Sequence, residues 1–331
     1  MKRTWFLLVI LAMLLTACSE ENTTSKEKEK AEDISIMLDW YPNAVHTAIY
    51  VAKEKGYFAD EGLNVNIEMP ADTNDPLKLA ATGKVDLAIS YQTQLLVSRA
   101  EGIPVVSVAA LVRHSLDAIM FKKESGIQSP KDLEGKNIGY PSASVNEAVV
   151  STMVKKDGGD INKVKMTDVG WDLMSSLATD HVDALTGAYI NHELVLLKKE
   201  GYDMDILKLT DFGVPDNYEL VVVTGEKTLK KKKAAIEKFW QAVTKAQEDV
   251  KKDPDAALKV LLDHENGSFP LDKDVEIESL RVLLPLMEES NKPFGYQEEK
   301  TWNEVARWLY ESKVIKEKLD VKDAFINIVS E

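Results

Sequence analysis

The stretch that decides the fold covers residues 34–69 and reads ISIMLDWYPNAVHTAIYVAKEKGYFADEGLNVNIEM. Its first part, 34–38, is a short alternating apolar run, which predicts a β-strand. The segment 46–55 has apolar residues at helical spacing and ends at Gly56, so it predicts an α-helix. Residues 63–69 alternate again and predict a second strand. A strand, a helix and a strand in this order indicate parallel strands joined by a crossover helix.

The alternation continues beyond this unit and then restarts. Helices are predicted at 75–82 and 92–101, and strands at 85–90 and 105–111. The restart predicts strands at 119–121, 137–140, 163–169 and 182–187, and helices at 129–133, 146–156 and 171–179. A strand at 220–223 would return the chain to the first group, and helices follow at 230–251, 254–263, 274–289 and 298–312. The pattern is typical of parallel sheets covered by helices on both faces.

A short internal repeat indicates that the two groups of strands and helices are lobes of similar structure. Ala81-Thr82-x-x-Val85-Asp86 recurs as Ala178-Thr179-x-x-Val182-Asp183, and each copy ends a helix, turns and enters a strand. We therefore expect an α/β fold of two lobes, with lobe 1 from 33–115 plus 219–331 and lobe 2 from 116–218. Ligands of open α/β sheets lie outside the carboxyl ends of the strands, which predicts a ligand cleft between the lobes.

The N-terminal residues have the features of a secretory signal. Two basic residues precede an apolar run that ends at Leu15, and a small-residue site ends at Cys18. The run of about eleven apolar residues is too short to span a bilayer, which takes roughly twenty. We expect a signal peptide at 1–17, lipidation of Cys18 as in a bacterial lipobox, and a polar linker at 18–32. The alternative is an ordinary signal peptide with an incidental cysteine.

The single cysteine and the net charge indicate where the protein lies and which partners are excluded. A lipid on Cys18 would anchor the protein to the outer, extracytoplasmic face of the cell membrane. The formal net charge of −14 argues against nucleic acid, whose phosphates require lysine and arginine. Because Cys18 is the only cysteine, its lipidation would leave no thiol for a disulfide, a catalytic nucleophile or a metal site.

No catalytic or metal-binding signature occurs in the sequence. It has no nucleophile elbow, zinc helix or phosphate-binding glycine loop. The five histidines show no convincing metal spacing. His192 and Glu193 are adjacent, and adjacent residues on a regular helix or strand do not face together. We expect a binding protein that is not an enzyme and carries neither metal nor cofactor.

Aromatic, amide and acidic side chains gather where the predicted strands end. Nine residues are candidates for ligand binding: Asp39, Trp40, Asn43, His46, Tyr91, Trp171, Tyr189, Asn191 and Glu193. Rings that stack, together with amides and a carboxylate, suit a small planar ligand with ring nitrogens and an amine. Two alternatives stay open from the residues alone. Some of these rings could belong to the core, and the segment 141–146, which leads into a helix, could instead bind an anion.

Four motifs resemble a known family. They are Asp39-Trp-Tyr-Pro-Asn43-x-x-His46-Thr47, Val51-Ala-Lys-x-x-Gly56-Tyr-Phe58-x-x-x-Gly62-Leu63, Gly83-Lys-Val-Asp86 and Gly135-Lys-Asn-Ile-Gly139-Tyr140. Over about residues 34–325 the chain is similar to the periplasmic-type solute-binding proteins for thiamine pyrimidine precursors. The glycine-containing pieces around Phe58 and Asp86 are shared with alkanesulfonate, taurine and nitrate binders. The segment from Trp40 to His46 is more specific for the pyrimidine branch.

The resemblance implies a type II periplasmic-binding-protein fold that closes on its ligand by a hinge. It implies an ABC permease and its ATPase as partners, and a ligand similar to formylaminopyrimidine or hydroxymethylpyrimidine. In that role Glu193 would accept a hydrogen bond from the exocyclic amine, and Asn43 or Asn191 would meet ring nitrogens. Three of the aromatic candidates, Trp40, Tyr91 and Tyr189, would enclose the ring.

The same family includes the eukaryotic pyrimidine synthase of thiamine biosynthesis, which is an enzyme. That branch uses a lysine to hold pyridoxal phosphate, a nearby histidine and a cysteine-rich iron segment. Here the lysine position falls on Ser90, the histidine position falls on Gln94, and no cysteine follows Cys18. Because serine cannot form a Schiff base, a pyrimidine-modifying enzyme is disfavoured.

A binder of an anion, such as an alkanesulfonate or nitrate, is the second alternative. Such a site needs arginine or lysine near the cleft. Arg99, Arg113 and Lys136 are the few candidates, and none lies in a strong motif.

Overall fold

A computed structural model describes residues 31–141, 145–265 and 270–329, which form one compact unit. The predicted signal peptide, Cys18 and nearly all of the linker fall outside these residues, as do Ser142 and Ser144. The expectations attached to them stay predictions. Within the described ranges, no helix combines the length and the apolar character that crossing a bilayer demands.

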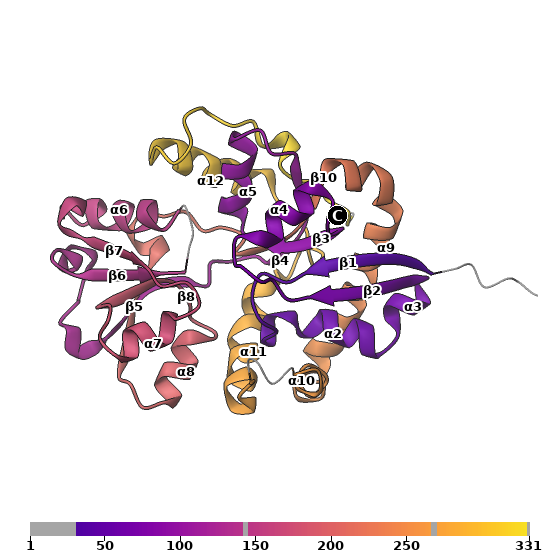
Figure 1. Cartoon of the computed structure of the whole chain (residues 1–331), viewed down its shortest axis with the longest axis horizontal. Helices are drawn as coiled ribbons and strands as arrows, with labels where there is room; N and C mark the ends of the chain where they lie inside the picture. Colours follow the sequence, from indigo (N-terminus) through magenta and orange to yellow (C-terminus); the bar gives the residue numbers. More distant parts are fainter. Residues whose placement is uncertain (1–30, 142–144, 266–269, 330–331) are drawn as a thin grey trace, which may run out of the picture. The chain divides into compact units, whose positions relative to one another are not determined.

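The first sheet has five strands in the order β2-β1-β3-β10-β4 (Figure 1). They are β1 (Glu32–Met37), β2 (Leu63–Glu68), β3 (Leu87–Ser90), β4 (Val105–Val112) and β10 (Leu220–Gly225). Strand β1 pairs in parallel with β2 and β3, as the strand–helix–strand pattern predicts. Strand β10 is antiparallel to both β3 and β4. The expectation of an all-parallel sheet is therefore wrong here, because the returning chain inserts β10 between two existing strands.

The second sheet has the order β7-β6-β8-β5-β9. Its strands are β5 (Asp117–Lys122), β6 (Asn137–Tyr140), β7 (Lys165–Asp168), β8 (Ala184–Tyr189) and β9 (Met204–Lys208). Strand β5 is antiparallel to β8 and β9, so this sheet is also mixed. Strand β9 has no counterpart in the sequence prediction. It is a short strand at the edge of the sheet, and only two of its residues are fully buried, so its pattern is weak.

Helices cover both sheets, most of them close to their predicted positions, although the sequence predicted no helix at 57–60 or 193–199. The α-helices are α2 (Thr47–Glu54), α3 (Tyr57–Asp60), α4 (Asp75–Thr82), α5 (Gln92–Ala100), α6 (Asn146–Lys156), α7 (Leu173–Ala178), α8 (Glu193–Lys199), α9 (Glu226–Lys252), α10 (Pro254–Asp263), α11 (Lys273–Met287) and α12 (Glu299–Glu311). Short 3-10 turns lie at Ala44–His46, Lys123–Ser125, Pro130–Leu133, Ile161–Lys163, Leu209–Phe212 and Val321–Asp323. Helix α9 begins four residues before its predicted start. Glu226 opens it, where an acidic side chain favours the helix N-terminus.

The chain crosses between the two sheets twice, at 113–116 and at 209–219. We call β1–β4, β10, α2–α5 and α9–α12 lobe 1, and β5–β9 with α6–α8 lobe 2. Asp216 ties the two crossings together, because its carboxylate accepts the Ser115 amide at 3.0 Å and lies 2.7 Å from His114 Nδ1. Whether the lobes are the separate units 33–115 plus 219–331 and 116–218 stays a prediction, since all residues from Ala31 pack as one unit.

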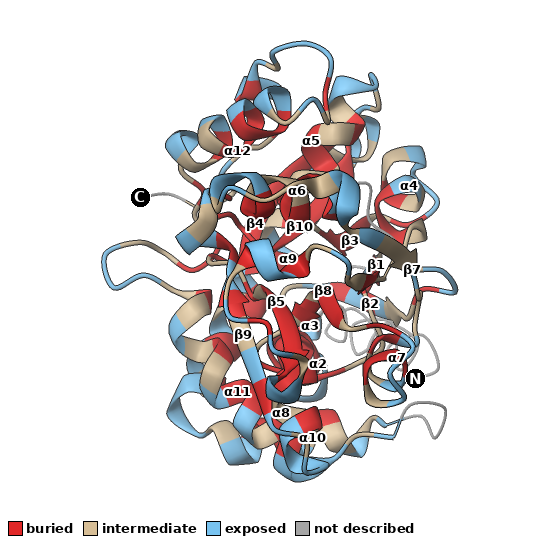
Figure 2. Cartoon of the chain, turned by 90° about the vertical axis from the view of Figure 1, so that its left-hand side faces the viewer, coloured by how far each residue is buried: buried red, intermediate tan, exposed pale blue. Residues whose placement is uncertain are grey.

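Buried side chains concentrate on the strands and on the inner faces of the helices, while the outer helix faces are exposed (Figure 2). In lobe 1 the C-terminal segments close this core. Trp240 on α9 is buried and donates from its indole nitrogen to the carbonyl of Phe294 at 3.1 Å. The carbonyl of the next residue, Gly295, accepts the Ala110 amide of β4 at 2.9 Å. The segment at 294–295 therefore joins α9 to the first sheet.

Gly295→Ala is expected to destabilise lobe 1 by about 3 kcal/mol, because it combines backbone strain with overpacking. Gly295 has φ +90°, and a Cβ there would lie 2.5 Å from ring atoms of buried Trp240. Gly102→Ala is the control, since Gly102 has φ +80° and open space around the Cβ position. It should cost about 1 kcal/mol from strain alone. Chemical denaturation measures both, and equal costs would contradict the packing described here.

Candidate functional site

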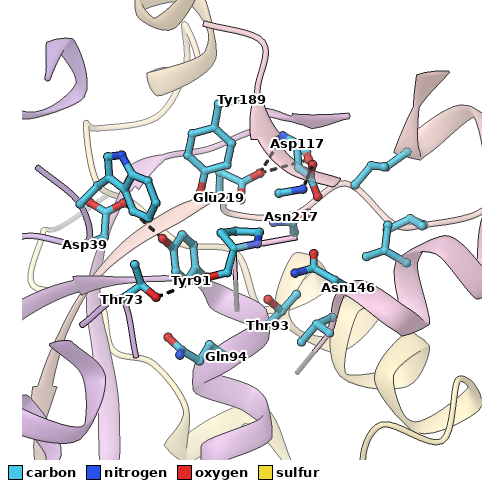
Figure 3. Close-up of a pocket in the computed structure, with 18 of the residues that line it drawn as sticks. Asp39, Thr73, Tyr91, Thr93, Gln94, Asp117, Asn146, Tyr189, Asn217 and Glu219 are labelled. Atoms are coloured by element: carbon cyan, nitrogen blue, oxygen red, sulfur yellow. Dashed lines mark hydrogen bonds between the residues drawn. The ribbon is translucent and has the colours of Figure 1, made fainter. Parts of the chain in front are cut away.

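A cavity lies between the lobes and holds about 1230 Å³ of empty space, including the part open to solvent (Figure 3). Its walls come from the ends of β1, β3 and β8, the start of β5, and both crossing segments. This is the edge of the sheets at which the sequence places a ligand. Its polar and aromatic lining residues include Asp39, Trp40, Asn43, Tyr91, Gln94, Asp117, Asn146, Tyr189, Asn191, His192, Glu193, Asn217 and Glu219.

Most of the sequence-predicted residues meet at this cavity. Those that line it are Asp39, Trp40, Asn43, Tyr91, Tyr189, Asn191 and Glu193. His46 and Trp171 are not among the lining residues, but each contacts one of them. His46 Nε2 lies 3.0 Å from Asp39 Oδ1, and the Trp171 ring centroid lies 3.9 Å from that of Trp40. Their direct contact with a ligand stays a prediction.

The carboxylate of Asp39 is oriented from two sides. His46 is fully buried, and its Nδ1 accepts the Asn43 amide at 3.2 Å. The proton of the imidazole therefore lies on Nε2, which donates to Asp39. On the other side the Tyr91 hydroxyl lies 3.4 Å from Asp39 Oδ2. His46 is thus a positioning residue beneath the cavity wall.

Sequence reasoning missed two acidic residues beside the crossings: Glu219 ends the second crossing, and Asp117 begins β5 directly after the first. Glu219 Oε2 accepts the amides of Leu116 at 2.8 Å and Asp117 at 3.3 Å, and its Oε1 accepts the Tyr189 hydroxyl at 3.2 Å. Asp117 Oδ1 accepts the Gly187 amide at 2.6 Å. In Figure 3 Asp117, Glu219 and Tyr189 lie together, away from Gln94. A signal was present in the sequence, since an acidic residue lies within two residues of each predicted lobe boundary.

Burial raises the pKa values of both Asp117 and Glu219. Removal from water raises the pKa of Asp117 well above its usual range, and the charge of Glu219 raises it further. Burial likewise raises the pKa of Glu219, although hydrogen bonds from the backbone of Leu116 and Asp117 oppose the shift. The ligand-free cleft therefore holds carboxyl groups whose negative charge is only partly compensated.

Glu193 forms a close pair with its neighbour. His192 Nδ1 lies 3.0 Å from Glu193 Oε1, and Glu193 Oε2 accepts the Tyr189 amide at 2.8 Å. The sequence argument that adjacent residues do not face together fails here, because His192 has φ −117° and ψ −73° and precedes the regular part of α8. Burial alone would lower the pKa of His192, but the charges of Glu193 and Glu276 and the hydrogen bond to Glu193 raise it to about 10.

The described cavity wall takes its positive charge from the His192 imidazolium rather than from a lysine or arginine. Among the described residues that line it there is no lysine or arginine. The three candidate cations lie elsewhere, in ion pairs: Arg99 with Glu226, Arg113 with Glu289 and Glu298, and Lys136 with Asp183. The position expected for a Schiff-base lysine is Ser90, whose hydroxyl donates to Gln94 Oε1 at 2.8 Å. The described ranges also hold no His, Cys, Asp and Glu cluster suited to a metal ion.

Comparison with known proteins identifies the family. The family described as NMT1/THI5 like matches residues 43–257. The chain belongs to the NMT1/THI5-like family. It is 43% identical to the Formylaminopyrimidine-binding protein of Halalkalibacterium halodurans, over 97% of each chain. It is also 28% identical to the 4-amino-5-hydroxymethyl-2-methylpyrimidine phosphate synthase THI11 of Saccharomyces cerevisiae, over 70% of this chain and 71% of the synthase. The NMT1/THI5-like resemblance predicted from the sequence motifs is thereby confirmed.

A solved structure identifies the fold of this NMT1/THI5-like protein. The alkanesulfonate-binding protein SsuA from Xanthomonas axonopodis pv. citri superposes with a TM-score of 0.69 at 14% identity. The match covers 89% of this chain and 98% of SsuA. The expected α/β periplasmic-binding-protein type II fold is confirmed.

Asp117→Asn is expected to stabilise the ligand-free protein at neutral pH. A raised pKa means that the folded protein keeps this proton to a higher pH than the unfolded chain does. Stability is therefore lost as the pH rises from about 4, the unfolded value, towards the raised one. The uncharged amide in the Asp117→Asn variant avoids this loss of folding stability. Thermal unfolding at pH 8 should show a midpoint about 2–4 °C higher for the variant, with the difference closing near pH 4.

The control for this measurement is Asp211→Asn, which changes an exposed carboxylate and should leave the midpoint alone. A midpoint of the Asp117 variant below wild type at pH 8 would mean that the carboxylate is well compensated, contrary to the electrostatics given above.

Proposed function

We propose that this protein is the extracytoplasmic solute-binding protein of an ABC importer. In this proposal it captures a thiamine pyrimidine precursor, formylaminopyrimidine or hydroxymethylpyrimidine, for import and salvage. One observation carries the proposal above others. The described wall of the cleft has four carboxylates, Asp39, Asp117, Glu193 and Glu219, and no lysine or arginine. Such a site favours a ligand that donates hydrogen bonds and carries no negative charge.

The chemistry of a 4-aminopyrimidine suits this wall. Its exocyclic amine can donate to Glu193, whose oxygens each keep a lone pair beside their bonds to His192 and Tyr189. Two buried polar atoms support a polar ligand, because Asn191 Oδ1 and Asn146 Nδ2 have no hydrogen-bond partner among the described residues. A buried polar group without a partner costs about 1–3 kcal/mol, which a ligand can relieve.

The aromatic lining supports a flat ring. Trp40, Tyr91 and Tyr189 come from both lobes and line the same cavity. Rings in offset or edge contact contribute about 0.5–1.5 kcal/mol beyond the area that they bury. The printed name of the relative with 43% identity, a formylaminopyrimidine-binding protein, agrees with this ligand class.

An anion such as an alkanesulfonate or nitrate is a poorer fit, although SsuA shares the fold. The anion would meet carboxylates in a site of low dielectric, where like charges repel strongly. Arg99, Arg113 and Lys136, which such a binder would need, have their own carboxylate partners outside the cavity lining.

A catalytic role has less support than binding. Ser90 and Gln94 occupy the positions that the synthase branch gives to its lysine and histidine. No covalent attachment through an imine is open to serine. We therefore propose a binder that returns its ligand unchanged and needs no cofactor.

The proposal includes the membrane setting. A lipid on Cys18 and the polar linker to residue 32 would hold the binding unit at the outer face of the cell membrane. Release of the ligand would then take place at a permease driven by its ATPase. The net charge of −14 continues to argue against nucleic acid as a partner.

Calorimetry with residues 31–331 tests the ligand class. Formylaminopyrimidine or hydroxymethylpyrimidine should give saturable heat, whereas taurine and nitrate should give none. Saturable binding of taurine or nitrate alone would refute the proposal.

Glu193→Gln is expected to weaken binding of the aminopyrimidine by about 10–150-fold, the loss of one charge-assisted hydrogen bond. Glu200→Gln is the matched control on the same helical segment, because Glu200 is exposed at the end of α8. An unchanged affinity in the Glu193 variant would remove this carboxylate from the role of amine acceptor.

A further inference from the structure

His192 lies between two carboxylates that belong to different lobes. Glu193 follows it in lobe 2, with 3.0 Å between His192 Nδ1 and Glu193 Oε1. Glu276 comes from α11 of lobe 1, with 3.5 Å between His192 Nε2 and Glu276 Oε1. All three residues are buried, and Glu276 is only 1% exposed. One side of the cleft is therefore joined by an ion pair that crosses from one lobe to the other.

Glu276 is held so that one oxygen faces His192. Its Oε2 accepts the amide of Ala44 at 2.7 Å, next to the cavity residue Asn43. Its Oε1 makes no hydrogen bond within the described residues and has only the approach of His192. One turn further along α11, Ser279 Oγ accepts a hydrogen bond from Asn191 Nδ2 at 3.0 Å. Helix α11 thus contacts the residues immediately before Glu193 at two points.

Three titratable groups face His192 among the described residues: Glu193, Glu276 and Tyr41. Glu193 faces it from α8, Glu276 faces it from α11, and the Tyr41 ring packs edge-on at 5.8 Å from the segment after β1. Burial raises the pKa of the Tyr41 phenol, and the two glutamates raise it further, so this hydroxyl stays neutral. A buried imidazolium with a single carboxylate partner would compensate its desolvation poorly. The second carboxylate, supplied by lobe 1, adds to the larger effect of Glu193 in keeping the proton on His192.

We propose that Glu276 is a positioning residue for the ligand site, acting through His192. When the lobes are together, Glu276 holds the imidazole charged, and the charged imidazole fixes Glu193 as an oriented carboxylate for the amine of the ligand. When the lobes part, His192 loses this partner and Glu193 loses its fixed orientation. Ligand binding and lobe closure then favour each other through one ion pair, as thermodynamic linkage requires. The ligand class in this inference rests on the proposed function.

The proposal predicts a change in pH dependence. With its pKa raised to about 10, His192 contributes a stabilisation that is complete below about 6.5 and is lost as the pH rises through about 10. Burial lowers the pKa of His192, and the charge of Glu276 opposes this effect. Removing that charge must therefore lower the pKa of His192. The loss of the ion pair then occurs at lower pH in the variant than in wild type.

The first experiment needs no ligand. NMR of ¹⁵N-histidine-labelled protein, residues 31–331, follows the imidazole of His192 in wild type, Glu276→Gln and Glu278→Gln. The Gln side chain keeps an oxygen for the Ala44 amide, so the fold should be retained. Glu278 is the matched control, because it lies exposed on the same helix and pairs with Arg281 among the residues that the structure describes. The His192 midpoint should fall by more than one pH unit in the Glu276 variant and stay in place in the control. An unmoved midpoint in the Glu276 variant overturns the proposal.

The second experiment measures affinity for the aminopyrimidine between pH 6 and pH 9. Wild type and Glu278→Gln should show the same profile. Glu276→Gln should bind about tenfold more weakly at pH 9 than wild type, with a smaller loss at pH 6. A loss equal at all pH values would make Glu276 merely structural and would overturn its positioning role.

His192→Gln provides an independent check if the Glu276 variant does not fold. It should weaken binding by about tenfold at pH 7, and adding Glu276→Gln should then have little further effect where the double variant folds. Unchanged affinity in His192→Gln overturns the proposal. If wild type binds no aminopyrimidine, the proposed function fails instead, while the titration of His192 still decides whether Glu276 holds its proton.

Discussion

The structure depends on compensating negative charge inside a cleft that has no described lysine or arginine in its wall. Asp39 has His46 and Tyr91, Glu219 has three backbone or hydroxyl donors around the first crossing and Tyr189, and Glu193 has His192. These donors orient each carboxylate but do not use every lone pair of its two oxygens. A neutral or cationic ligand that donates hydrogen bonds completes the compensation, and an anion would add to the imbalance.

The same groups join the two lobes, so assembling the site and bringing the lobes together are one event. Glu219 comes from the second crossing and binds amides of the first, close to the hinge. Trp40 of lobe 1 packs against Trp171 of lobe 2, with 3.9 Å between ring centroids and 37° between the ring planes. Each lobe alone would present only half of these partners. The free energy of ligand binding can therefore favour closure of the two lobes.

Local sequence patterns predicted much of the fold, because periodicity and glycine stops act within a few residues. The strand–helix–strand unit at 34–69 lies within about two residues of its expected bounds. Strand direction was not predictable in this way, since β10 is placed by its return from lobe 2 rather than by its own composition. Strand β9 was missed because its buried residues, Met204 and Leu207, are three positions apart and do not give the alternation that predicts a strand.

The same distinction applies to the candidate site, where local patterns could be predicted and long-range pairs could not. Aromatic and amide residues directly after strands, such as Trp40 and Tyr91, could be chosen from sequence, because strand ends meet at one edge. Asp117 and Glu219 could not be paired, because 102 residues separate the bonded groups and only the folded crossings bring them together. The ion pairs that link Glu193 and Glu276 through His192 likewise form only when the two lobes are together.

The most direct measurement is a crystal structure of the complex with an aminopyrimidine. It should place the exocyclic amine within hydrogen-bond distance of a cleft carboxylate, whereas a ligand outside the cleft, or an amine facing none of these carboxylates, would contradict this account.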